Sequence, residues 1–144
     1  MVYFIKGNMF DGEYDVLVNA VNCVGVMGKG LALEFRHRFP TNFIKYKDYC
    51  NKEHLRPGEI FVMQDNEQII INAATKNHWK DKSEEDWVIS CIKNIVDWLN
   101  SNRYVESVAV PKLGCGLGGL DWTKIRPIME NWFNTCKQDI YIFE

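Results

Sequence analysis

The sequence lacks the patterns that mark metal-held, disulfide-stapled and membrane-embedded proteins. Its five cysteines are an odd number and form no Cys-x-x-Cys pair, which argues against a disulfide framework and against a zinc site. The three histidines lie far apart, and none belongs to a His-Glu-x-x-His motif. No apolar run approaches the roughly 20 residues of a transmembrane helix, and residues 1–6 are too short and too polar for a signal peptide. We therefore expect a reduced, cytoplasmic protein with no membrane contact, no metal and no other cofactor.

An excess of positive charge is also absent. Lysine and arginine number 17 against 19 acidic residues, a formal net charge of −2, whereas a protein that grips long duplex DNA through phosphates is expected to be basic. Two local segments, 35–38 and 76–82, remain candidates for a basic patch. With 144 residues, 47% hydrophobic and 25% charged, the chain has a globular composition, which excludes disorder, collagen and coiled coil. We expect one monomeric domain over residues 1–144.

The order of apolar patterns predicts an α/β protein. Helices are expected from Leu31 to the interruption at Pro40, over 41–52, after a capping-box pattern at 83–86, and over 122–134. Strands are expected over residues 2–6, 15–22, 58–63, 68–73, 105–110 and 140–143, the third and fourth forming a hairpin. Six strands interleaved with three or four helices predict a three-layer α/β/α fold with a mixed, mostly parallel six-stranded sheet.

Two glycine-rich loops, residues 23–30 and 114–119, each follow a buried strand and precede a helix. Ligands of open α/β sheets bind beyond the carboxyl ends of strands, and the free N–H groups of a helix start attract anions. The two loops together therefore predict a site for a pyrophosphate-containing nucleotide. Residues 25–30 lack the length and the Ser/Thr of a Walker A loop. Gly114, Gly116 and Gly119 satisfy Gly-x-Gly-x-x-Gly, but too little chain follows for a Rossmann unit. Taken singly, either loop can equally be a tight turn that starts a helix.

Three segments, 6–8, 18–32 and 111–122, together resemble a macrodomain over essentially the whole chain and in the right order. The resemblance implies that the first segment binds the adenine end of ADP-ribose, the second the distal ribose and the third the diphosphate. The implied ADP-ribose-binding residues are Asn8, Met9, Asn19, Asn22, Gly28, Lys29, Gly30, Gly114, Cys115, Gly116, Leu117 and Gly118.

Some of these residues have alternative roles. Asn8 stands where most macrodomains carry an aspartate that reads the adenine amino group, and its amide oxygen is expected to accept from that amine instead. Asn22 is expected to hydrogen-bond the distal ribose, while Asn19 can equally support the loop from within. Cys115 would need a histidine base to act as a nucleophile, so we prefer a small apolar residue whose backbone N–H contacts phosphate.

The segments 114–122 and 75–79 resemble one macrodomain branch, which includes the terminal ADP-ribose glycohydrolase of animals and the DarG antitoxins of bacteria. In that branch the lysine after threonine, here Lys76, is closely tied to catalysis. DarG removes ADP-ribose from thymidine bases in DNA, and residues 75–79 are especially similar to it. Gly118 stands where the animal enzyme has a catalytic aspartate, which favours the DarG-like interpretation. Lys76 can attack the anomeric carbon as an amine or donate to the leaving base as a cation.

The resemblance thus implies an ADP-ribosyl hydrolase acting on a modified base, with thymidine in single-stranded DNA as substrate and a cognate ADP-ribosyltransferase as counterpart, in a bacterium or encoded by a phage. His78 and Trp79 are candidates for nucleic-acid contact, because an aromatic plane can stack on an unpaired base. Two alternatives stay open. One is a non-catalytic reader of ADP-ribose, and the other is a phosphatase acting on ADP-ribose-1″-phosphate.

Overall fold

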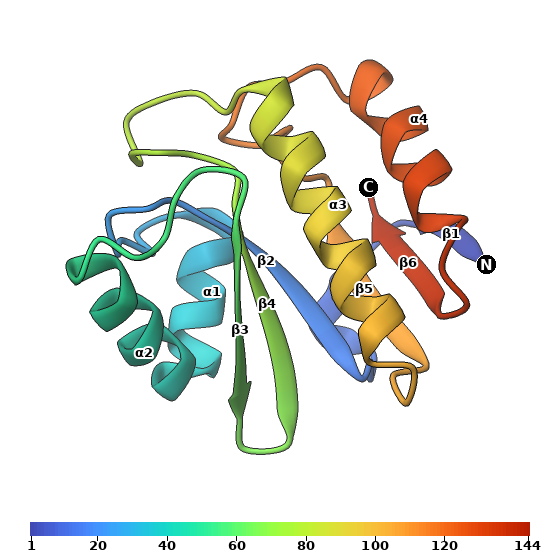
Figure 1. The fold of residues 1–144 in the computed structure, drawn as a ribbon, viewed down its shortest axis with the longest axis horizontal. Coiled ribbons are helices and arrows are strands. Elements are labelled where there is room, and N and C mark those ends of the chain that lie inside the picture. Colours follow the sequence, from blue (N-terminus) through green and yellow to red (C-terminus); the bar gives the residue numbers. More distant parts are fainter.

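The computed structural model describes all 144 residues, and its six strands join one sheet with helices on both sides (Figure 1). No helix combines the length and the apolar character needed to cross a bilayer. Along the chain the elements are β1 (Val2–Ile5), the 3-10 turn η1 (Met9–Asp11), β2 (Val16–Val21), α1 (Gly30–Arg38), α2 (Pro40–Asn51), β3 (Ile60–Asp65), β4 (Gln68–Ala74), α3 (Glu85–Ser101), β5 (Ser107–Pro111), α4 (Trp122–Phe133) and β6 (Asp139–Phe143).

The strand order is β1-β6-β5-β2-β4-β3. Every neighbouring pair is parallel except β3 and β4, which form the expected hairpin. The hairpin turn is tighter than the sequence indicated, because the strands pair as far as Asp65 and Gln68. Asn66 permits this turn by adopting a φ of +54°, a conformation that asparagine tolerates better than most residues. The mixed, mostly parallel sheet is thus confirmed.

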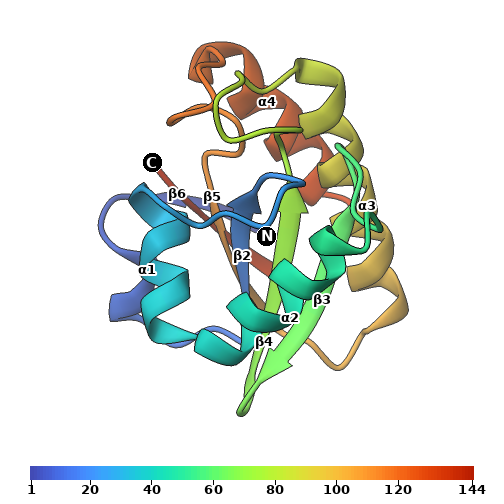
Figure 2. The same ribbon diagram turned by 90° about the vertical axis from the view of Figure 1, so that its left-hand side faces the viewer.

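Helices α1 and α2 cover one face of the sheet, and α3 and α4 cover the other (Figures 1 and 2). Phe35 and Tyr46 are fully buried on the first side, and Ile92, Leu99 and Phe133 on the second. Strand β2 lies between the two layers, which explains why its residues are apolar on both faces, with Asn19 as the one polar exception. The three-layer α/β/α architecture is confirmed.

The start of α3 differs from the expected capping box. The helix begins at Glu85, and Glu84 occupies the N-cap position without a side-chain hydrogen bond. Ser83 is instead buried against the loop after β5, where its N–H donates to the carbonyl oxygen of Gly118 (2.9 Å). The Ser83 hydroxyl has no hydrogen-bond partner. A contact between distant segments therefore replaces the local cap that the sequence pattern predicted.

The direction of the chain's connections changes at β2 and β5, which are neighbours in the sheet. The chain leaves β2 toward α1 and α2, and it leaves β5 toward α4 on the opposite face (Figure 1). Ligands of open α/β sheets bind at such points, where successive connections diverge. The two glycine-rich loops are the segments that leave β2 and β5.

Truncating the core residue Leu99 tests this packing. Leu99 is fully buried, so we expect Leu99→Ala to lower the free energy of unfolding by about 2–5 kcal/mol through lost burial and a residual cavity. Ile44 on α2 is 61% exposed, and Ile44→Ala should change stability by no more than about 0.5 kcal/mol. Urea unfolding followed by circular dichroism measures both, and equal effects would contradict the assignment of the core.

Candidate functional site

Four loops meet at one edge of the sheet, because the carboxyl ends of parallel strands point the same way. They follow β1 (6–8), β2 (22–29), β4 (75–84) and β5 (112–121), and Figure 2 shows the last three gathered above the sheet. The strand order places the β1 loop on one side of the neighbouring strands β5 and β2 and the β4 loop on the other. Asn8 and Lys76 therefore lie at opposite ends of one row of loops.

The loop after β5 has the form of an anion site. The backbone N–H groups of Gly116, Leu117 and Gly118 make no hydrogen bond within the protein. The loop is closed by the N–H of Leu120, which donates to the carbonyl oxygen of Gly114 (2.9 Å). Gly114 adopts a φ of +76° that permits this closure. Successive free N–H groups in a tight loop form a concavity that suits phosphate oxygens.

The opposing loop adds the start of α1. Lys29 occupies the N-cap position without a side-chain hydrogen bond, and the first turn contains no acidic residue. The first N–H groups of the helix therefore remain open to an anion. A Cβ placed on Gly30 would lie 3.7 Å from Leu117 Cδ1, so the two glycine-rich loops are in contact. Gly30 thus lies against the loop after β5, and binding of a phosphate by Gly28, Lys29 and Gly30 stays a prediction.

Gly118 is required by close packing. A Cβ at this position would collide with the carbonyl oxygen of Gly114 and with Ser83 Oγ. The loop therefore has no room for the aspartate that the animal glycohydrolase carries at the corresponding place. This departure from the animal enzyme is built into the conformation of the loop.

Asn22 organises the loop after β2. Its Oδ1 accepts hydrogen bonds from the N–H groups of Val24 (3.1 Å) and Val26 (3.3 Å), and its Nδ2 donates to the Val26 carbonyl (2.8 Å). The buried hydroxyl of Tyr46 also contacts Asn22 Oδ1 (2.9 Å). One amide hydrogen of Asn22 is left over, so the expected contact with ribose would have to use it.

Asn19 and Met9 lie deeper than the other predicted residues. Asn19 is fully buried in β2, and its Nδ2 lies near Asn72 Oδ1 (3.4 Å) and the sulfur of Met27 (3.9 Å). Met27 is itself buried within the glycine-rich loop. These contacts match the alternative in which Asn19 supports the loop from within. Met9 is 4% exposed and joins the core under η1.

The backbone of Lys76 is attached to the end of β2. Its N–H lies 3.4 Å from the Val21 carbonyl, and its carbonyl oxygen accepts from Cys23 Sγ (3.4 Å). The Cys23 N–H donates to the Asn77 carbonyl (3.0 Å). Burial raises the pKa of the Cys23 thiol to about 12, so the thiol stays protonated and available as a donor. The Lys76 ammonium takes part in none of the four ion pairs of the structure.

An aromatic and cationic corner follows Lys76. The rings of His78 and Trp79 lie 5.3 Å apart, and Lys80 Nζ lies 5.3 Å from the Trp79 ring centroid. His78 Nδ1 accepts from the Lys80 N–H (3.2 Å), which leaves the ring proton on Nε2. Trp79 is 48% exposed, so its indole offers an open surface three residues after Lys76.

Cys115 lacks the surroundings of a nucleophile. Burial raises the pKa of its thiol to about 11, which outweighs the opposing effect of Lys112. The thiol donates to the Leu113 carbonyl (3.4 Å), and no histidine hydrogen-bonds it. A protonated thiol without a base is a poor nucleophile, in keeping with the preferred role as a small apolar residue.

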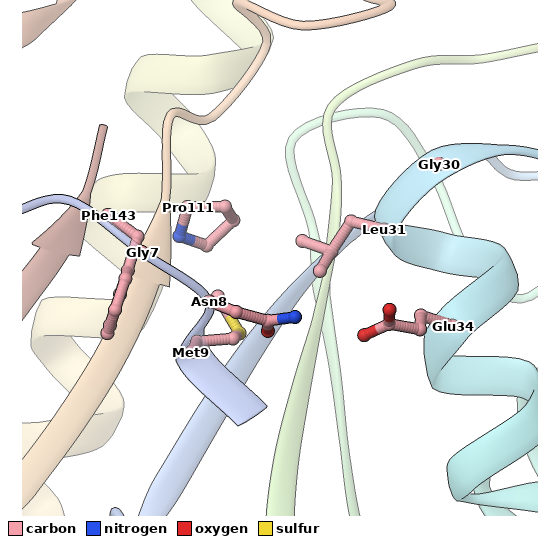
Figure 3. Close-up of a pocket in the computed structure, with 8 residues that line it drawn as sticks. All are labelled: Gly7, Asn8, Met9, Gly30, Leu31, Glu34, Pro111 and Phe143. Carbon is pink, nitrogen blue, oxygen red and sulfur yellow. The ribbon is translucent and has the colours of Figure 1, made fainter. Parts of the chain in front are cut away.

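A pocket of about 320 Å³ lies between η1 and α1 at the far end from Lys76 (Figure 3). Asn8 lines it, but Asn8 Oδ1 accepts from the Phe10 N–H (2.9 Å) as the cap of η1. This arrangement differs from the expected contact of that oxygen with an adenine amine. The site residues implied by the sequence leave out five lining residues, Gly7, Leu31, Glu34, Pro111 and Phe143. The first, second and fourth of these lie within the segments that resemble a macrodomain. Phe143 ends a parallel strand and is detectable by the carboxyl-edge rule, whereas Glu34 gave no local signal.

Substitution of Gly118 tests the packing of the loop after β5. Gly118→Ala forces the added methyl against Gly114 and Ser83, and we expect a loss of about 1–3 kcal/mol in the free energy of unfolding. A Cβ on Gly116 has no neighbour within 4 Å, so Gly116→Ala is the matched control and should have little effect. Chemical denaturation compares the two, and equal stabilities would contradict the close approach described.

Comparison with known proteins agrees with this geometry. The Macro domain family model matches residues 18–129. A DNA ADP-ribosyl glycohydrolase from Thermus aquaticus is 38% identical over 149 residues, covering 100% of this chain but 41% of that relative. The macrodomain of Mycobacterium tuberculosis DarG superposes with a TM-score of 0.95 at 34% identity, covering 99% and 97% of the two chains. The structure of Thermosipho africanus DarTG in complex with ADP-ribose superposes with a TM-score of 0.90 at 33% identity, covering 99% of this chain and 41% of that chain. The chain therefore belongs to the macro domain family, and among the family's solved structures it resembles those of DarG.

Proposed function

We propose that this chain is a hydrolase that removes ADP-ribose from a modified base in single-stranded DNA, with thymidine as the base. The observation that carries the proposal is the placement of Lys76. It lies at the end of the row of loops opposite Asn8, its backbone is attached to β2 through Cys23, and its ammonium has no carboxylate partner. The Thermus aquaticus relative is named a DNA ADP-ribosyl glycohydrolase, which supports the hydrolase activity without naming the base or the strand.

The row of loops matches the parts of ADP-ribose in order. The pocket beside Asn8 would take the adenine, the free N–H groups at 116–118 and at the start of α1 would bind the diphosphate, and the distal ribose would reach the end of β4. The similar Thermosipho africanus DarTG is a complex with ADP-ribose, which supports ADP-ribose as the ligand. The anomeric carbon would then face Lys76.

The surroundings of Lys76 suit a nucleic-acid substrate. The loops after β2, β4 and β5 contain five lysines against three acidic residues, although the whole chain is slightly acidic. None of these lysines takes part in an ion pair, so they are free to contact phosphates. The exposed Trp79 offers a stacking surface, and bases in a single strand are open to stacking. The lysines are Lys29, Lys76, Lys80, Lys82 and Lys112.

The reaction replaces the bond between the anomeric carbon and the base by a bond to water oxygen. In one route, the Lys76 ammonium donates a proton to the departing base while water attacks the anomeric carbon and loses a proton to solvent. In the other, a neutral Lys76 amine attacks first, the base leaves with a proton, and water then releases ADP-ribose. Borohydride treatment during turnover separates the routes, because only the second gives a reducible adduct on the protein.

On this proposal, the chain reverses the product of a DNA ADP-ribosyltransferase. We place it as a monomer in the cytoplasm of a bacterium, or of a bacterium infected by a phage that encodes it. The reader and phosphatase alternatives would use the same ADP-ribose site. The tests below therefore distinguish the three functions by the group that is released from the anomeric carbon.

Removal of the Lys76 amine tests catalysis directly. The substrate is a single-stranded oligonucleotide that carries ADP-ribosyl-thymidine, and mass spectrometry measures the release of ADP-ribose. We expect Lys76→Ala to lower the rate of this release by about a hundredfold or more. Binding of free ADP-ribose, measured by calorimetry, should persist. Lys45→Ala on exposed α2 is the matched control. Wild-type protein that binds ADP-ribose without releasing it from the oligonucleotide would favour the reader.

Removal of the Trp79 indole tests the DNA contact. Base–aromatic stacking contributes about 1–3 kcal/mol, so Trp79→Ala should raise KM for the modified oligonucleotide by about 5- to 160-fold and leave the affinity for free ADP-ribose unchanged. Tyr104, which is 69% exposed elsewhere, provides the control Tyr104→Ala. If the protein is a phosphatase acting on ADP-ribose-1″-phosphate, neither substitution should change its activity on that substrate. An unchanged KM of Trp79→Ala for the modified oligonucleotide would contradict the proposed DNA contact.

A further inference from the structure

The pocket between η1 and α1 has apolar walls and two polar groups that face each other. Figure 3 shows the Asn8 amide and the Glu34 carboxylate pointing toward one another across the gap. Pro111 and Phe143, from the ends of β5 and β6, lie on the Asn8 side, and Leu31 lies on the Glu34 side. A flat, mostly apolar group with a polar edge fits such a pocket.

Asn8 is oriented by its own hydrogen bond. Its Oδ1 accepts from the Phe10 N–H (2.9 Å), and because an N–H must meet an oxygen there, the amide cannot be flipped. Its Nδ2 makes no hydrogen bond within the protein and points into the pocket (Figure 3). Asn8 therefore presents a donor to whatever occupies the pocket.

Glu34 presents the complementary acceptor. It lies one turn after Gly30 on α1, and its Oε2 pairs with Arg38 Nε (3.4 Å) from the following turn. Glu34 Oε1 has no partner in the protein and remains available to accept a hydrogen bond. The Glu34 side chain is 43% exposed, so the carboxylate is open to a ligand that enters the pocket.

We infer that Asn8 and Glu34 together read the edge of a 6-aminopurine, with Glu34 as the determinant that accepts its amine. An adenine edge offers the N6 amine as a donor beside a ring nitrogen that accepts, which complements the carboxylate and the amide. Hypoxanthine and guanine carry an oxygen at position 6, and that oxygen would face the Glu34 carboxylate. The inference rests on the proposed ADP-ribose ligand and adds a residue of α1 to its recognition.

The pairing also explains why Asn8 suffices where an aspartate is usual in macrodomains. A carboxylate at position 8 would face Glu34 across the pocket and repel it. Glu34 on α1 thus supplies the hydrogen-bond acceptor, and Asn8 at the start of η1 supplies the donor. Discrimination by a site that hydrogen-bonds a ligand group is strong, because a mismatched ligand leaves polar groups unpaired.

The test compares two ligands, ADP-ribose and its hypoxanthine counterpart, by calorimetry. Wild-type protein should prefer ADP-ribose by about tenfold or more. Glu34→Ala should weaken ADP-ribose binding and reduce the preference, the remainder coming from the Asn8 amide, which still meets the ring N–H of hypoxanthine. Glu34→Gln, whose amide can donate to the position-6 oxygen, should reduce or invert the preference. Arg38→Met is the matched control, since it removes the ion pair, keeps an apolar stem over the Phe10 ring and leaves the carboxylate in place. The preference should survive in this variant.

Failure of this inference is distinguishable from failure of the proposed function. Equal affinity of wild-type protein for both ligands, or an unchanged preference in Glu34→Ala, overturns the role of Glu34 while leaving hydrolysis untouched. Binding of neither ligand overturns both. In the hydrolysis assay, Glu34→Ala should raise KM and leave kcat unchanged, because Glu34 lies at the end of the site away from the reacting carbon. A lowered kcat at unchanged KM would contradict a role in base recognition.

Discussion

The shape of the site depends on the hydrogen bonds that Asn22 makes immediately after β2. One side chain fixes the N–H groups of Val24 and Val26 and receives the Tyr46 hydroxyl from α2. The next residue, Cys23, donates hydrogen bonds to two consecutive carbonyl oxygens, from its thiol to Lys76 and from its N–H to Asn77. Two consecutive residues thus set both the glycine-rich loop and the segment that carries the lysine. A loop with many glycines has high conformational entropy, so a preformed anion site requires such internal bonds.

The strands and helices were predictable because their signals are local. Alternation, continuous apolar runs and the glycine-rich loops located nearly every element, and the buried run of β2 correctly indicated a central strand. The same local reasoning failed at Ser83, whose pattern resembles a cap but whose position is set by contact with Gly118. It also gave no sign of Glu34, because nothing in the sequence near α1 shows that η1 packs opposite it. The engagement of Asn22 by Tyr46 likewise depends on the packing of α2.

The two ends of the site differ in packing and exposure. The loop after β5 is closed by its own hydrogen bonds and packed against Ser83, and the pocket beside Asn8 is bounded by strand ends. The segment with His78, Trp79 and Lys80 is exposed and makes mainly local contacts. Tight binding of a constant nucleotide at one end and an open surface at the other is the arrangement expected of a protein whose ligand is attached to a larger and more variable molecule. Macro domains with the same fold can differ in substrate through this open end alone.

The uncapped start of α1 links the ligand to the fold itself. Most helices begin with a side chain that satisfies their first N–H groups, but Lys29 cannot accept a hydrogen bond. A bound diphosphate would supply the missing acceptors, so the nucleotide would serve as the N-cap of a helix that also forms part of the core through Phe35. Conformational stability then becomes a function of nucleotide concentration and rises by about 2.7 kcal/mol when free ligand exceeds Kd a hundredfold. The population of folded protein in a cell would in that case report how much ADP-ribose is present.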